Sequence, residues 1–219
     1  EPFFRYSLRS ETYTWIDATV GNDLGMTCDN CCMPVSIGFT FEFYGRTYDT
    51  LYVCDDGYLS FSPVSAPGPW NACFPDRHTP NNIIAPLWDD LNPESGGAVY
   101  SFLEGTAPNR RLTLEWSGIP HYPAVGDATF EVTLFEGINQ ILVQYQDTVF
   151  GSGSDSGATA TAGLENITGI NGQALSCYSS DLKDETAWRA VPFGAYRLYS
   201  DDMENGPNGW SGFGLWHQE

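Results

Sequence analysis

The amino-acid sequence predicts an all-β protein: an antiparallel, jelly-roll-like β-sandwich with long loops and unpaired terminal strands. Apolar and polar residues alternate along most of the chain, and no segment keeps a helical apolar period for more than about two turns. The 23 glycines and 14 prolines suit a chain with many tight turns. Short strands without helices favour two packed antiparallel sheets, and a closed barrel is the alternative.

The N-terminal part of the chain predicts three consecutive strands. Residues 35–43 alternate, and a turn at 44–46 leads into a second strand at 47–54. A turn at 55–57, with the sequence Asp-Asp-Gly, leads into a third strand at 58–62, and Asp-Gly between alternating runs is a strong hairpin signal. The apolar residues of the first strand share one face: Val35, Ile37, Phe39, Phe41 and Phe43.

The rest of the chain predicts a long loop followed by further strands. The proline-rich segment 65–82 carries Cys73, so we expect a surface loop that a disulfide holds in place. The clearest hairpin joins residues 129–135 to residues 140–146, because the two runs carry matching apolar positions. A Gly/Ser/Asp-rich loop is expected at 151–157. The other predicted strands lie at 83–91, 98–103, 111–116, 158–166 and 195–199.

The two chain ends are predicted to differ from the body. Residues 1–10 are expected as an N-terminal extension or edge strand, and residues 11–200 as the sandwich domain. The tail 201–219 has turn chemistry followed by a short aromatic stretch that cannot bury itself alone. It is a candidate donor strand or the start of a next module; a tail packed on its own domain is the alternative. The candidate assembly residues are Phe3, Phe4, Tyr6, Trp210, Phe213, Leu215 and Trp216.

The charge of the chain restricts its partners. The net charge is −19, with only nine lysines and arginines. Nucleic acids and anionic membrane surfaces are disfavoured, because no basic cluster exists to neutralise their phosphates. Cations, glycans and other proteins, including copies of the chain itself, remain as partners. No apolar run reaches the roughly 18 residues of a membrane-spanning helix.

The cysteines indicate an oxidising compartment and an extracellular location. Their even number predicts disulfides, although the sequence does not choose among the pairings. The spacing of the first three would also allow zinc, but the histidines are isolated, so zinc is disfavoured. The segment 166–168, Asn-Ile-Thr, makes Asn166 a candidate glycosylation site. The six cysteines are Cys28, Cys31, Cys32, Cys54, Cys73 and Cys177.

No catalytic motif is present in the sequence, so we expect a protein that is not an enzyme. The three scattered histidines cannot form His-Glu-x-x-His, and the loop 151–157 fails the register of a nucleophile elbow. A phosphate-binding loop is absent, since Lys183 is the only lysine. A pair of carboxylates of the glycosidase type stays open, because the spacing of the acids in space is unknown.

Two kinds of ligand site remain as hypotheses, although no cofactor is certain. Ca²⁺ prefers hard oxygen ligands, and acidic side chains at a strand end or in the tail could converge around it; a solvated acidic patch is the alternative. Trp70 and Tyr122 lie in proline-rich loops and are candidates for stacking on a glycan, whereas most large aromatics of a sandwich are core. The candidate Ca²⁺ ligands are Asp89, Asp90, Asp201, Asp202 and Glu204.

Two blocks of the sequence resemble a known class of module. Residues 39–61 resemble the FxFYGxxYxxLYVxxNGxLxF pattern of accessory β modules in large secreted bacterial proteins. Residues 82–90 resemble their IAPFWDD segment, which is also similar to nidogen-like extracellular domains. The resemblance covers roughly residues 12–178. It departs at Asp56, where the family usually has Asn, and in the cysteine-bearing insert 28–32.

The tail resembles the opening strand of the jelly-roll modules in immune-inhibitor-A-like secreted metallopeptidases. These resemblances imply an extracellular, bacterial and non-enzymatic protein, without implying a ligand. The first hypothesis is a structural subunit that self-associates head to tail by strand complementation, as in a filament. The second is an accessory module that attaches a secreted hydrolase to glycans or to a surface.

Overall fold

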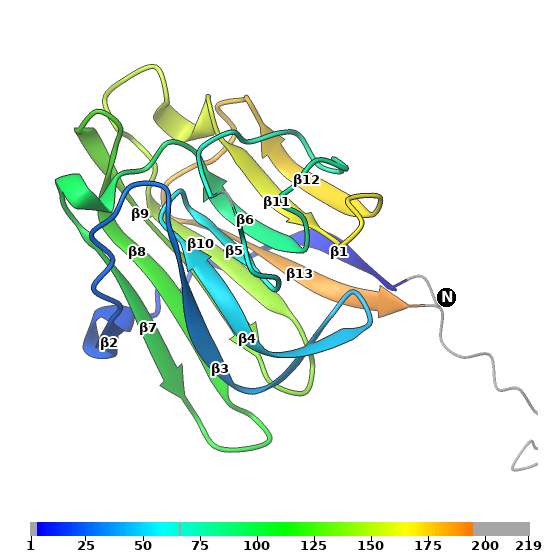
Figure 1. Ribbon diagram of the computed structural model, residues 1–219. Coiled ribbons are helices and arrows are strands. Elements are labelled where there is room, and N and C mark those ends of the chain that lie inside the picture. Colours follow the sequence, from blue (N-terminus) through cyan, green and yellow to red (C-terminus); the bar gives the residue numbers. More distant parts are fainter. Residues whose placement is uncertain (1–3, 66, 195–219) are drawn as a thin grey trace, which may run out of the picture.

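Two antiparallel sheets pack face to face in the computed structural model, which describes residues 4–65 and 67–194 (Figure 1). The strands are β1 (Phe4–Glu11), β2 (Asn22–Asp23), β3 (Cys32–Phe43), β4 (Arg46–Cys54), β5 (Tyr58–Ser60), β6 (Ile83–Trp88), β7 (Ala98–Glu104), β8 (Arg111–His121), β9 (Val125–Phe135), β10 (Ile141–Asp147), β11 (Thr161–Glu165), β12 (Gly172–Cys177) and β13 (Thr186–Gly194). Three single-turn 3-10 helices are also described: η1 (Ala18–Val20), η2 (Pro93–Ser95) and η3 (Asp155–Gly157). The prediction of an all-β sandwich is confirmed.

The order of strands places the first and last described strands side by side. The seven-stranded sheet runs β1-β13-β10-β9-β8-β7-β2, and the six-stranded sheet runs β12-β11-β6-β5-β4-β3. Strand β1 pairs with β13 along its whole length, from Phe4 opposite Gly194 to Glu11 opposite Ala187. Both β1 and β12 are edge strands, and they lie next to each other where the two sheets meet.

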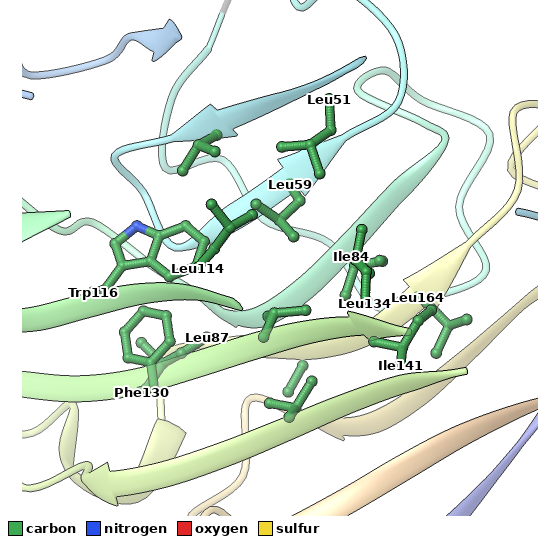
Figure 2. Packing of buried hydrophobic residues seen from close by; sticks show 14 of the residues in the cluster. Leu51, Leu59, Ile84, Leu87, Leu114, Trp116, Phe130, Leu134, Ile141 and Leu164 are labelled. Carbon is green, nitrogen blue, oxygen red and sulfur yellow. The ribbon is translucent and has the colours of Figure 1, made fainter. Parts of the chain in front are cut away.

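The core lies between the sheets, and Figure 2 shows side chains from both contributing to it. Trp116 is fully buried and stacks on Phe130, with ring centroids 5.1 Å apart. Its indole nitrogen donates a hydrogen bond to the Cys54 carbonyl of the opposite sheet, at 3.1 Å. A buried indole N–H needs such a partner, so the two sheets are joined by a polar contact as well as by packing.

The alternation read from the sequence sets which residues face the core. In β3, Ile37 and Phe41 are fully buried, whereas Thr40, which lies between them, is exposed. The β9–β10 hairpin also has its predicted apolar pairs: Leu134 lies opposite Ile141. The other two predicted pairs are Val132 opposite Val143 and Phe130 opposite Tyr145.

Two turns need glycine for physical reasons. Tyr44 and Gly45 both have positive φ, the conformation of a two-residue hairpin turn that matches strand twist. Gly57, in the β4–β5 turn, has φ +74°, and a Cβ there would lie 2.0 Å from the Leu87 carbonyl oxygen. Only glycine allows this close approach, which holds the β4–β5 turn against the end of β6.

Some strands differ from the sequence-based expectation. Strand β8 continues to His121, beyond the predicted 111–116, and the sequence pattern does not predict β2, β12 or β13. Strand β12 is an edge strand whose residues are mostly half-buried or exposed on both faces, so it carries no clear alternation. The strand predicted at 195–199 lies outside the described residues.

The six cysteines form three disulfides, as their even number predicted. The pairs are Cys28–Cys31, Cys32–Cys54 and Cys73–Cys177. The second pair joins facing residues of β3 and β4, and the third ties the long loop after β5 to β12. The first three cysteines are all oxidised, so none of them is a zinc thiolate.

An irregular segment covers the outer face of each sheet. Residues 62–65 and 67–82, the loop cover, lie over the six-stranded sheet, where an apolar cluster is buried: Cys54, Tyr58, Phe74, Ile83, Ala85 and Trp88. Residues 12–20, the N-terminal cover, lie over the seven-stranded sheet. There the buried residues are polar: Thr113, Glu115, Glu131, Thr133 and Gln144.

Candidate functional site

The predicted assembly residues fall into two groups. Phe4 lies in β1, opposite Gly194. The Tyr6 side chain is only 1% exposed and packs on Phe43, and its hydroxyl donates to the Glu42 carbonyl at 3.1 Å. Tyr6 is therefore part of the protein's own core, and its side chain is not available to a partner. The remaining assembly residues lie outside the described residues: Phe3, Trp210, Phe213, Leu215 and Trp216.

A groove opens between the two neighbouring edge strands, β1 and β12, and we call it the seam groove. Its volume is about 350 Å³. It is lined by Leu8, Arg9, Ser10, Tyr145, Leu175, Asp181, Leu182, Lys183, Thr186, Ala187 and Trp188. Leu175 is 36% exposed, whereas Leu182 and Trp188 form the buried floor. The groove therefore offers an apolar floor with charged groups at its rim.

Both strands beside the seam groove have an open edge. Within the described residues β1 pairs only with β13, and β12 pairs only with β11. An open strand edge presents backbone N–H and C=O groups to which a further strand can add. The arrangement can therefore receive an extended apolar segment with side chains in the groove and backbone bonds to one edge.

The second candidate site is the β4–β5 turn, which carries two adjacent acidic residues. Asp55 and Asp56 are both 0% exposed. The Cys31 amide donates to Asp55 Oδ1 at 3.0 Å, whereas Asp55 Oδ2 and both Asp56 oxygens have no donor in good hydrogen-bond geometry among the described residues. Burial, aided by the negative charges of Asp55, Asp90 and Asp29, raises the pKa of Asp56 to about 9. The Leu91 amide lies near Asp56 and lowers its pKa slightly, against the effect of burial. The buried carboxyl of Asp56 and one oxygen of Asp55 thus lack the partners that such groups usually have.

The predicted Ca²⁺ ligands Asp89 and Asp90 lie beside this turn, at the end of β6. Asp89 Oδ2 accepts a hydrogen bond from the Thr159 hydroxyl at 2.6 Å, and Asp89 Oδ1 accepts one from the Asp90 amide at 3.0 Å. His121 Nε2 lies 3.4 Å from Asp89 Oδ1. Burial lowers the pKa of His121, but the contacts with Asp89 and the Tyr122 carbonyl outweigh it, so the pKa is raised.

Both carboxylate oxygens of Asp89, a predicted Ca²⁺ ligand, thus already have partners within the protein. In the part of the chain that the structure describes, no three Asp, Glu, His or Cys side chains are already arranged as a metal site. The other predicted Ca²⁺ ligands, Asp201, Asp202 and Glu204, lie outside the described residues.

The predicted glycan-binding aromatics are exposed and lie in loops beside the same end of β6. Trp70 is 75% exposed and Tyr122 is 50% exposed. The Asn71 side chain, next to Trp70, donates to the Trp88 carbonyl at 2.7 Å, and the Tyr122 amide donates to the Asp90 carbonyl at 2.8 Å.

Three other tryptophans, Trp88, Trp116 and Trp188, are buried, as expected for the core of a sandwich. Sequence reasoning missed Tyr178, which is 52% exposed and whose hydroxyl donates to the Asn71 carbonyl at 2.6 Å. Its only sequence signal was its position next to Cys177, because the disulfide brings it to the loop cover.

Asn166, the candidate glycosylation site, lies in the turn between β11 and β12. Its side-chain oxygen accepts hydrogen bonds from the Thr168 hydroxyl at 3.0 Å and from the Asn171 amide at 3.2 Å. The side chain is half-buried. The glycosylation of Asn166 stays a prediction.

Comparison with known protein families gives a match over most of the chain. The family model described as NIDO related matches residues 4–189, which is most of the chain. No curated protein and no solved structure gave a significant match. No helix in the described ranges is long and apolar enough to span a membrane. The extent of the match, from the first strand to within the last, shows that the chain belongs to the NIDO-related family.

Proposed function

We propose that this protein is a non-catalytic, extracellular structural subunit that self-associates head to tail. The terminal segment 201–219 of one copy enters the seam groove of the next copy and adds to an open strand edge. The observation that carries this proposal is the groove of about 350 Å³ between two edge strands with open edges. Three disulfides and membership of the NIDO-related family support the extracellular location.

The chemistry of the tail matches that of the groove. Its aromatic and aliphatic residues need an apolar surface, and Leu175 offers one that is partly exposed. The tail's acidic residues precede this stretch, and the groove rim carries Arg9 and Lys183 in a chain with nine cationic residues in all. Asp181 also lies at the rim, so the charged residues that line the groove carry a small net positive charge.

The geometry of such an association determines the product. The donor segment and the acceptor groove are different surfaces, so the contact is heterologous, and heterologous contacts build open filaments unless rotation closes a ring. Contacts would combine backbone hydrogen bonds with buried aromatic side chains. The tail is expected to supply Trp210, Phe213, Leu215 and Trp216.

The first experiment measures the mass of the full chain by light scattering over a range of concentrations, with electron microscopy of the same sample. We expect masses well above 24.2 kDa that increase with concentration. Deletion of 201–219 should abolish assembly and leave a folded monomer. A deletion variant that still assembles would show that the tail is not the connector.

A groove variant tests the acceptor side. Leu175→Arg places a charge on the partly exposed wall of the groove and should weaken association by at least about tenfold, because a charge would be buried on assembly. Ile138→Arg is the matched control: Ile138 is 54% exposed but does not line the groove, so association should be unchanged. Equal effects of both substitutions would contradict docking in the groove.

A second function, binding of glycans by an accessory module, is favoured by a separate observation. Trp70 and Tyr122 are exposed, and their loops are hydrogen-bonded to residues at the end of one strand, β6. Exposed aromatic rings stack on sugar rings. We expect binding on a glycan array to be lost in a Trp70→Ala/Tyr122→Ala variant and kept in Phe193→Ala, which removes another exposed ring. A parent chain that binds no glycan would contradict this function.

A further inference from the structure

The β4–β5 turn buries two adjacent carboxyl groups without a neutralising partner. Asp55 and Asp56 are 0% exposed, and three of their four carboxyl oxygens have no donor in good hydrogen-bond geometry among the described residues. The five ion pairs of the described residues do not include either one. A buried carboxylate is costly unless it is paired or coordinates a metal, so this turn needs an explanation.

Backbone hydrogen bonds bring two other acidic segments to the same turn. The Asp55 amide donates to the Cys31 carbonyl at 3.1 Å, which fixes the disulfide loop that carries Asp29. The Asp89 amide donates to the Asp56 carbonyl at 3.2 Å, which fixes the strand end that carries Asp90. Asp29 and Asp90 are half-buried, so both side chains keep some contact with solvent, unlike the buried pair.

The chemistry of this cluster selects a particular kind of ligand. The charged side chains that act on Asp56 are all acidic: Asp55, Asp90 and Asp29. His121 is the cationic candidate at this end of β6: its ring contacts Asp89, and its charge also acts on Asp90. Ca²⁺ takes about six to eight oxygen ligands in a flexible arrangement and accepts carboxylates, backbone carbonyls and waters together. Mg²⁺ demands a near-ideal octahedron and fits such a mixed set less well.

We propose that Asp55, Asp56 and Asp90 bind a Ca²⁺ ion between the β4–β5 turn and the end of β6. The free oxygens of Asp55 and Asp56 provide the buried side of the site, and Asp90 provides the side that faces solvent. The described side chains do not already form a set of three metal ligands, so Asp90 joins Asp55 and Asp56 only when the ion binds. Backbone carbonyls and water therefore complete the coordination, and Asp29 provides negative charge at the entrance.

The test uses the full chain at pH 7.5, with Tb³⁺ as a luminescent probe for Ca²⁺. Trp116 donates to the Cys54 carbonyl, next to Asp55, so its indole can sensitise a Tb³⁺ ion bound at the turn. We expect Tb³⁺ luminescence that Ca²⁺ displaces. We also expect a rise in Tm of about 5–10 °C when the Ca²⁺ concentration is one hundred times Kd.

Three variants decide where the ion binds. Asp56→Asn keeps the shape of the side chain, so it should fold and lose both responses. Asp49→Asn, an exposed acid in β4, is the matched control and should keep both. A triple variant of the tail, Asp201→Asn/Asp202→Asn/Glu204→Gln, should keep them too.

Two outcomes would overturn the proposal. One is a parent chain without any Ca²⁺-dependent change in Tm or Tb³⁺ luminescence, which would mean that a proton, not a metal, neutralises Asp56. The other is a response that survives in Asp56→Asn and disappears in the triple tail variant, which would move the site to the tail. Self-association by the tail does not depend on either result.

Discussion

The two outer faces of the sandwich are both covered by irregular segments, but by opposite means. Under the loop cover, Trp88 and Phe74 are buried with aliphatic neighbours, and the Trp88 indole nitrogen donates to the Gly68 carbonyl at 3.1 Å. Under the N-terminal cover, the Ala18 amide donates to Glu115 at 2.9 Å, and Thr14 exchanges two bonds with the Gln144 side chain. The loop cover is held mainly by apolar burial and a disulfide, with one buried carboxyl, Glu165, that accepts from the Asp76 amide at 2.9 Å. The N-terminal cover is held by hydrogen bonds to buried polar groups.

This difference determines how each cover responds to change. Apolar burial is roughly proportional to area and depends little on pH, whereas a buried polar network depends on the protonation of its members. The loop cover should therefore be sensitive mainly to loss of its anchor, and to pH at Glu165, whose pKa burial raises to about 7. The N-terminal cover should be sensitive to pH and to the removal of single partners.

The largest effect is expected from removing the anchor of the loop cover. In Cys73→Ala/Cys177→Ala, a link with a sequence separation of 104 residues is lost, and unfolding free energy should fall by about 2–5 kcal/mol. The physical reason is that the unfolded chain gains conformational freedom. Denaturant unfolding of both proteins measures the difference. A loss below about 1 kcal/mol would mean that apolar burial alone holds the loop cover.

The next effect concerns the buried carboxyl of Glu131 under the N-terminal cover. Burial raises its pKa to about 8, against the hydrogen bonds from Gln144 and the Ile16 amide. A carboxyl whose pKa is higher in the folded than in the unfolded state binds the proton more tightly when folded. Its contribution to stability is therefore complete below about pH 4.5 and is lost progressively as the pH rises through about 8.

Glu131→Gln should remove this dependence and stabilise the protein at pH 8 relative to the parent, by up to a few kcal/mol. The unfolding free energy from denaturant titrations between pH 5 and 8, about the window of this shift, checks it. Glu94→Gln, at an exposed site, is the control and should keep the parent's slope. An identical slope in Glu131→Gln would show that Glu131 does not carry the proton.

A smaller effect is expected at a pair of buried threonines on the same outer face. Thr113 and Thr133 are 0% exposed, and their hydroxyl oxygens lie 2.9 Å apart across β8 and β9. Thr113→Val leaves the Thr133 hydroxyl without its partner and should cost about 1–3 kcal/mol. Thr113→Val/Thr133→Val should cost much less, because both polar groups are gone. A double-mutant cycle that gives no coupling energy between Thr113 and Thr133 would show that their hydrogen bond does not stabilise this face.

The smallest effect is expected at Trp70, within the loop cover but 75% exposed. Trp70→Ala should change the unfolding free energy by no more than about 0.5 kcal/mol, because little apolar area is lost. Thermal and denaturant unfolding measure it. A cost above about 1 kcal/mol would place Trp70 among the residues that hold the loop cover, and would weaken its use as a glycan-binding residue.

The sequence predicts the strands whose alternation is enforced by one buried face. The pairing of Leu134 with Ile141 followed from this pattern alone. The two covers could not be predicted in this way, because an irregular segment has no period. Glu131 therefore has the pattern of a solvent-facing residue, and the continuous apolar run of residues 83–88 does not show which face of the sheet Trp88 occupies.

The candidate sites, too, could be predicted only where a local sequence pattern marks them. Trp70 and Tyr122 were recognised as exposed because prolines and turns mark their loops. Asp56 lies in an Asp-Gly turn, which usually faces solvent, and its burial depends on two segments distant in sequence that fold over it. The seam groove depends on the neighbouring positions of β1 and β12, which no local pattern encodes.

The pairing of β1 with β13 also has a consequence for the order in which the protein is made. Synthesis proceeds from the N-terminus, so β1 emerges long before its partner strand β13, which ends at Gly194. Until then, the hydrogen-bonding groups of β1 have no native strand to pair with and are open to other chains. A newly synthesised copy therefore remains vulnerable to wrong association until almost all of the described chain has been completed.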